Sequence, residues 1–339
     1  MKTHDAGPPY EGQPLSHWAA MTLDQSCDHA PSPLAMEAMT AVEAVGPDAI
    51  PHLLRWIQPP WPNSILPSGA VNSFKVLGRR AESAIPELVR LLQNYKLKLT
   101  NSFFDEDFAA FANVAEALSW LGPKALPYLL GAAKDTPCLN ATQEIVHCLG
   151  NFGPDGAPAI PDLIEWTRNP DQWIRLHAVN ALGRIAQAPA DVIPTLVACL
   201  KDADMLVRRD AASALGRFGN AARGLAPDLI AMLDDPTWQA RTGPMFALVQ
   251  IGECEDVVLP LLARKLHDTN RIIRRCAALA LGELGGRRAF EVLLQAANDP
   301  DDSAREAIFQ SLKKIDLVAL ENSGKKFTDG CRWYRGRND

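Results

Sequence analysis

One short motif returns along this chain at a constant interval of 33 residues. It consists of a proline set between aliphatic residues, and its clearest copies are centred on Pro161, Pro194, Pro227 and Pro260. A fixed period of this length is typical of stacked supersecondary units, each of which buries its apolar face on its neighbours. The sequence therefore predicts a repeat protein with a long exposed surface.

The best-kept unit, residues 170–201, has the pattern of two antiparallel helices. Ile174, Ala178 and Leu182 form one apolar helical face. Pro194 is expected to open the second helix, because the first turn of a helix has N–H groups without helical acceptors. The turn at 202–204 supplies aspartates that can cap the next helix.

Extending this register predicts an all-α, right-handed α-solenoid of about eight helix pairs. Pro51, Pro86 and Pro127 take the proline position upstream, and Phe290 takes it downstream. Further helices near 15–23 and 305–320 would cap the two ends.

The register also divides the chain. Residues 1–33 form an N-terminal extension with a capping helix, and residues 34–320 form the solenoid. Its spacing is irregular over 34–137 and regular over 138–298. The irregular part holds a proline-rich loop at 58–67 and extra residues around 95–107. Residues 321–339 are a polar, basic tail with the composition of a disordered end.

Within the repeats, residues 169–183 read Asn-Pro-Asp-Gln-Trp-Ile-Arg-Leu-His-Ala-Val-Asn-Ala-Leu-Gly, and 202–216 and 268–282 are nearly the same. This pattern resembles the HEAT repeat of the bacterial type first described in phycobilisome lyases, over about residues 34–315. The resemblance implies the solenoid fold. The segment Tyr10–Trp18 is also similar to a segment that precedes such repeats in many bacterial proteins. Proteins of that kind often carry an export signal before this segment.

Composition narrows the classes of function. A net charge of −6 and a pI near 5.7 argue against general nucleic-acid binding, which needs clustered Lys and Arg. The seven cysteines form no CxxC pair, which favours reduced thiols. The first ten residues have no apolar stretch, and no window reaches 18 apolar residues. We therefore expect a cytoplasmic protein without a membrane span, exported only if the true start lies upstream.

Arginine recurs at the repeat period, at Arg175, Arg208, Arg241 and Arg274, with Arg305 following 31 residues later. These side chains could form a basic ladder for an acidic ligand. Alternatively, each could reach an aspartate or a carbonyl in the neighbouring turn. Regular recurrence favours the structural interpretation.

Three ionisable residues occupy one position on successive helices, and His147 lies one turn after the first of them. The three are Glu144, His177 and Asp210. A metal site would need such residue types, and the HEAT-like deoxyhypusine hydroxylases use His-Glu pairs in this region. Here the residues before the three are Gln143, Leu176 and Arg209, so that family's pattern is missing. A polar contact between repeats is favoured, and we expect no catalytic residue, metal or cofactor.

Aromatic and arginine side chains dominate the energetics of protein interfaces. Those in or near the two irregular loops are the predicted partner-binding residues: Trp56, Trp61, Arg90, Phe103 and Phe104. The concave face is expected to be lined by the second helices. The sequence favours a non-enzymatic scaffold that binds a protein partner along this face. The alternative is an accessory enzyme of the phycobilisome (bilin) lyase type.

Overall fold

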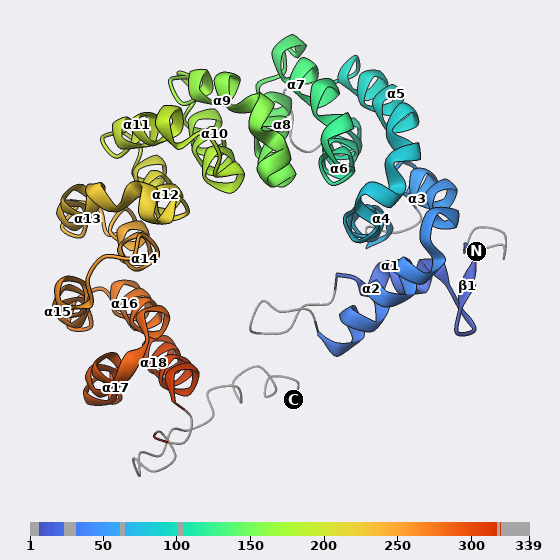
Figure 1. Cartoon of the computed structure of the whole chain (residues 1–339). Helices are drawn as coiled ribbons and strands as arrows, with labels where there is room; N and C mark the ends of the chain where they lie inside the picture. Colours follow the sequence, from blue (N-terminus) through green and yellow to red (C-terminus); the bar gives the residue numbers. More distant parts are fainter. Residues whose placement is uncertain (1–6, 24–31, 62–64, 100–104, 317–318, 320–339) are drawn as a thin grey trace. The chain divides into compact units, whose positions relative to one another are not determined.

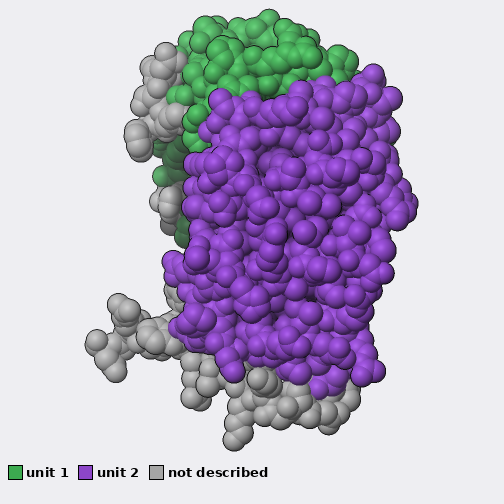
Figure 2. All heavy atoms as spheres, turned by 90° about the vertical axis from the view of Figure 1, so that its left-hand side faces the viewer, with its two compact units in different colours: residues 1–187 green, residues 188–339 purple. Residues whose placement is uncertain are grey.

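The computed structural model describes residues 7–23, 32–61, 65–99, 105–316 and 319. The chain divides into two compact units, 1–187 and 188–339, coloured green and purple in Figure 2. This division reflects which residues pack together. The boundary predicted at 137/138 reflects a change in the number of residues between repeats, and it stays a prediction. Phe103, Phe104 and the tail 321–339 lie outside the described residues.

Unit 1 begins with a small hairpin that packs on the first helix. Strands β1 (Pro9–Tyr10) and β2 (Gln13–Pro14) are antiparallel, with Tyr10 opposite Gln13. The indole N–H of Trp18, in α1 (Leu15–Met21), donates to the Tyr10 carbonyl at 3.1 Å, and Trp18 is buried. The hairpin and α1 are therefore joined into one unit at the N-terminal end of the described chain.

The rest of unit 1 alternates helices of two layers. They are α2 (Pro33–Val45), α3 (Ile50–Trp56), α4 (Ile65–Leu77), α5 (Ile85–Lys96), α6 (Glu106–Ser119), α7 (Leu126–Asp135), α8 (Leu139–Leu149), α9 (Ile160–Trp166) and α10 (Gln172–Ile185). Short 3-10 segments join several first helices to second helices, for example Gly46–Ala49 and Gly150–Ala159.

Unit 2 continues the alternation. Its helices are α11 (Pro189–Cys199), α12 (Met205–Gly216), α13 (Ala226–Met232), α14 (Thr242–Gln250), α15 (Glu255–Lys265), α16 (Arg271–Leu284), α17 (Gly286–Gln295) and α18 (Asp302–Ile315). Among the described residues, unit 1 contains the helix pairs from α2/α3 to α8/α9 followed by α10, and unit 2 contains α11 followed by the pairs from α12/α13 to α16/α17, with α1 and α18 at the ends. The predicted all-α solenoid with capping helices is confirmed.

From α2 onward, the even-numbered helices of each unit lie on the inner side of its curve and the odd-numbered helices on the outer side, whereas α1 packs beside the inner helices α2 and α4 (Figure 1). Small residues let the inner helices approach closely. A Cβ atom on Gly243 of α14 would lie 2.2 Å from the Arg209 carbonyl of α12, and one on Gly216 would lie 2.8 Å from the Ala247 Cα. Glycine is required at both contacts.

This layering corrects one expectation. The helices that carry Ala-x-x-Ala-Leu-Gly are the first of each predicted pair, and they line the inner face of each unit. The second helices, which carry the prolines, lie on the outer side (Figure 1). The expectation that second helices line the concave face is therefore wrong.

Two local predictions from the sequence have opposite outcomes. Proline is costly inside a helix, so the pair Gly243-Pro244 predicts that its helix starts late or kinks, and α14 begins only at Thr242, after a turn at 238–241. Pro194 was expected to open a helix, but α11 begins at Pro189 and contains Pro194. Pro189 satisfies the first-turn preference five residues earlier. None of the described helices is long and apolar enough to cross a membrane.

Candidate binding surfaces

The recurring arginines of unit 2 join the turns of successive repeats. The Arg208 guanidinium donates to both carboxylate oxygens of Asp235 at 2.9 and 3.0 Å, and to the carbonyls of Asp202 and Ala203 at 2.8 and 3.1 Å. Arg241 donates to the Asp235 carbonyl at 2.6 Å and lies 3.8 Å from the Asp268 carboxylate. Each arginine thus closes its own turn and reaches the next one.

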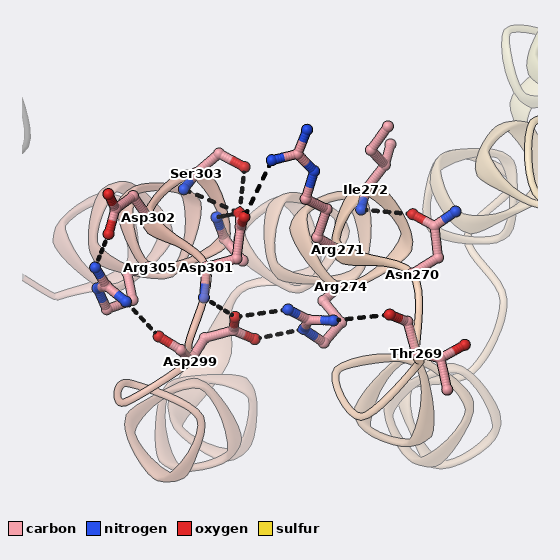
Figure 3. A network of polar contacts seen from close by, with 11 residues as sticks. Thr269, Asn270, Arg271, Ile272, Arg274, Asp299, Asp301, Asp302, Ser303 and Arg305 are labelled. Carbon is pink, nitrogen blue, oxygen red and sulfur yellow. Dashed lines mark hydrogen bonds and ion pairs between the residues drawn. The ribbon is translucent and has the colours of Figure 1, made fainter.

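Figure 3 shows the same arrangement between α16 and α18. Arg274 holds the Asp299 carboxylate through two hydrogen bonds of 2.7 and 2.9 Å, and Arg305 donates to the Asp299 carbonyl at 2.6 Å. Burial raises the pKa of Asp299, but the hydrogen bonds from Arg274 and the Asp301 N–H outweigh it, so the pKa is lowered. This is the geometry that the structural interpretation of the arginines expects.

In unit 1, Arg175 closes its own turn in the same way. Its guanidinium donates to the Asn169 and Pro170 carbonyls at 3.0 and 3.1 Å. The turns also cap the following helices, since the Asp171, Asp204 and Asp301 carboxylates accept N–H groups of the first turns of α10, α12 and α18.

A second set of polar side chains follows the inner helices of unit 1. We call it the inner row: Lys75, Glu116, Trp120, Glu144, His147 and His177. The Lys75 ammonium lies 4.6 Å from the centre of the Trp120 ring, which joins α4 to the end of α6. The rings of His147 on α8 and His177 on α10 meet edge to face with centroids 5.2 Å apart. The row therefore runs over four successive inner helices.

The two acids of the inner row are partly desolvated. Burial raises the pKa of Glu116, and burial together with the charge of Glu116 raises the pKa of Glu144. The Cys148 thiol, which is fully buried, lies 3.7 Å from a Glu144 carboxylate oxygen. Glu144 and His177 were singled out from the sequence. Lys75, Glu116 and Trp120 were missed, because Glu116 precedes Glu144 by 28 residues and so falls outside the 33-residue register.

The described residues contain no group of three His, Cys, Asp or Glu side chains placed to hold a metal ion.

Of the predicted partner-binding residues, Trp56, Trp61 and Arg90 lie in the described part of the chain. Trp56 is only 4% exposed and packs near His52 in the core, so its ring is not available at the surface. Trp61 is half-buried, and its indole N–H has no hydrogen-bond partner within the described part of the chain. Arg90 lies on the outer helix α5, where it pairs with Glu87. A binding role for Trp61, Arg90, Phe103 and Phe104 stays a prediction.

Comparison with known proteins identifies the type of repeat. Residues 160–248 and 226–313 match the model of HEAT repeats, so the chain contains HEAT repeats. No curated protein matches the sequence.

Among solved structures, the karyopherin Kap121p bound to the extreme C-terminus of the protein phosphatase Cdc14p is similar over 85% of this chain, with a TM-score of 0.56 and 15% identity. The chain spans 36% of the length of Kap121p. This likeness shows the solenoid fold alone.

Two bacterial structures are also similar. The YibA protein of E. coli has a TM-score of 0.46 and 19% identity, over 83% of this chain and 96% of that one. The complex of CpcE and CpcF of phycocyanin lyase from Nostoc has a TM-score of 0.43 and 21% identity, over 70% and 90%. Likeness at this level supports no shared activity.

Proposed function

We propose that this protein is a non-enzymatic interaction scaffold that binds a protein partner along the inner face of unit 1. The observation that carries the proposal is the inner row, because it places rings and charges of both signs on four successive helices. Stacked repeats present such a row as one extended surface, which suits a partner segment that lies along it.

The chemistry of the row fits a protein partner. Trp120 offers a large ring, and aromatic rings contribute strongly to interface energies. Glu116 and Glu144 are already partly removed from water, so covering them further costs less than covering fully hydrated carboxylates. The similar structure of Kap121p is described as bound to a protein segment, which supports a protein as the partner class.

A bacterial cytoplasmic location is part of the proposal. Five described cysteines are free thiols, namely Cys138, Cys148, Cys199, Cys254 and Cys276. Free thiols are typical of a reducing compartment.

The proposal is tested by capturing the partner from the native host and titrating it, purified, against the purified chain. The double variant Lys75→Ala/His147→Ala changes two exposed members of the row. We expect it to weaken binding at least tenfold, about 1.4 kcal/mol. The matched control Lys201→Ala/His267→Ala removes the same residue types at exposed positions away from the row and should bind normally.

The opposite pattern would refute the inner face as the site. Unchanged binding by the row variant, together with a loss in Trp61→Ala or Arg90→Ala, would place the partner on the surface predicted from the sequence.

A further inference from the structure

The recurring arginines begin at α10, and α8 is the last inner helix before them that lacks one. The fourth residue of α10, α12, α16 and α18 is an arginine, respectively Arg175, Arg208, Arg274 and Arg305. The fourth residue of α8 is Thr142, which stands 33 residues before Arg175. At this repeat, a short side chain takes the place of a long guanidinium-bearing one.

The intact repeats show what an arginine does at this position. Arg208 and Arg274 each donate to the carbonyls five and six residues before them, and to an aspartate 27 or 25 residues after them. The corresponding groups around Thr142 are the carbonyls of Thr136 and Pro137 and the side chain of Asn169. Asn169 accepts the Asp171 N–H at 2.9 Å, and its carboxamide oxygen has a second lone pair.

A groove of about 570 Å³ lies at this place in unit 1. Thr136, Pro137, Thr142 and Asn169 all line it, together with Glu165 and Trp166. The volume falls within the range of about 300–1,000 Å³ that ligand pockets occupy. The register and the groove therefore identify the same site independently.

The walls of this groove are held in place by contacts between repeats. The Lys134 ammonium on α7 lies 2.6 Å from the Asp162 carboxylate on α9. The Gln143 side chain on α8 donates to the Asp171 carboxylate at 3.0 Å, which joins α8 to the turn before α10. A pre-formed site loses little conformational freedom when it binds.

The charge and the apolar parts of the groove define its occupant. Asp162 is paired with Lys134, whereas the carboxylate of the exposed Glu165 has no hydrogen-bond or ion-pair partner among the described residues, so the groove has an excess of negative charge. Leu139, which also lines the groove, is 46% exposed, and Trp166 is half-buried. A planar guanidinium can donate to several acceptors and also stack on an aromatic ring, which an ammonium does less well.

We propose that this groove binds an arginine side chain of a partner segment, with a bulky apolar residue beside the arginine. The guanidinium takes the place that Arg208 and Arg274 take in their own repeats: it donates to the Thr136 and Pro137 carbonyls and to the Asn169 carboxamide oxygen, and the Glu165 carboxylate that also lines the groove balances its charge. The apolar neighbour packs on Leu139 and Trp166. This site is separate from the inner row, and the proposal does not depend on the function proposed above.

The test begins with a library of random nonapeptides selected on the immobilised full chain. We expect enrichment of arginine beside an aromatic or aliphatic residue. A labelled copy of the strongest peptide, titrated against the chain, should lose at least tenfold in affinity when its arginine is replaced by citrulline, which keeps the shape and removes the charge.

The decisive variant is Thr142→Arg, which supplies the missing arginine from within the chain. It should keep its helicity by circular dichroism and weaken peptide binding at least tenfold. The matched control is Thr195→Arg, because Thr195 also bonds back to a carbonyl four residues earlier in its helix. The control adds the same side chain elsewhere and should bind the peptide normally.

If Thr142→Arg misfolds, Glu165→Gln tests the same contact at an exposed position and should weaken binding about fivefold. Selection of peptides without arginine would overturn the proposal. The proposal would also be overturned if a selected peptide bound Thr142→Arg with an affinity within twofold of that for the unchanged chain. If Thr142→Arg misfolds, the same comparison applies to Glu165→Gln.

Discussion

The ion pair between Arg274 and Asp299 should be a principal support of unit 2. The two side chains are only 13% and 6% exposed, and four hydrogen bonds of Arg274 end on Asp299, Asp268 and Thr269. Removing one member of a buried pair typically costs 3–5 kcal/mol, because the other charge is left uncompensated. After Arg274→Ala, Asp299 still accepts the Asp301 N–H at 2.8 Å, so we expect the low end, about 3 kcal/mol.

Urea unfolding at pH 7, followed by circular dichroism, measures this effect. With a slope of about 2 kcal/mol per molar urea, the midpoint of unit 2 should fall by about 1.5 M. In a double-mutant cycle, the variant Arg274→Ala/Asp299→Ala should lose less stability than the sum of the losses of the two single variants. The difference should be at least about 1 kcal/mol. Arg287→Ala is the matched control, since Arg287 pairs with Glu291 but is 91% exposed, and exposed pairs contribute little.

The pH dependence follows from the lowered pKa of Asp299. A carboxyl whose pKa is lower in the folded state adds stability above its unfolded pKa, near 4, and loses this contribution as the pH falls through the folded pKa. The difference between the unchanged chain and Arg274→Ala should therefore shrink below about pH 4. If the urea midpoint of Arg274→Ala at pH 7 is no lower than that of the control Arg287→Ala, the recurring arginines do not have the structural role inferred here.

Three further changes have defined outcomes. In urea titrations, Glu144→Gln should stabilise unit 1 at pH 7 and have no effect near pH 4. Burial raises the pKa of Glu144, so its ionised form weakens the fold. The control Glu43→Gln, at an exposed position, should change the stability little. Gly243→Ala should destabilise unit 2 by about 2 kcal/mol through contact with a backbone carbonyl, whereas Gly131→Ala, with open space around it, should be neutral or stabilising in thermal unfolding. Ala186→Gly should raise stability by about 0.5 kcal/mol, since Ala186 ends α10 in the left-handed region with φ of 47°.

The repeat architecture could be predicted because its determinants are local. The proline and alanine positions fix where helices begin and which faces they bury, and the Gly243-Pro244 pair fixes the late start of α14. Pro194 misled because two prolines five residues apart both suit a first turn, and the choice between them depends on packing against neighbouring helices.

The choice of inner face could not be made from periodicity, because both helices of a pair have the same period. Curvature depends on how closely successive helices approach, and that is decided by contacts such as the one between Gly243 and the Arg209 carbonyl. The burial of Trp56 was missed for a related reason. Proximity to a proline-rich loop suggests exposure, but Trp56 is the last residue of α3 and turns into the core.

The groove at Thr142 could have been found as a missing arginine in the 33-residue register. Its significance depends on the turn geometry around it, which only the structure provides.

The central claim is that a protein partner binds along the inner face of unit 1. Hydrogen–deuterium exchange of the chain, with and without the captured partner, tests it most directly. We expect slower exchange in the inner helices α4, α6, α8 and α10 and unchanged exchange in the outer helices α5, α7 and α9. Protection confined to those outer helices, or to unit 2, would contradict it.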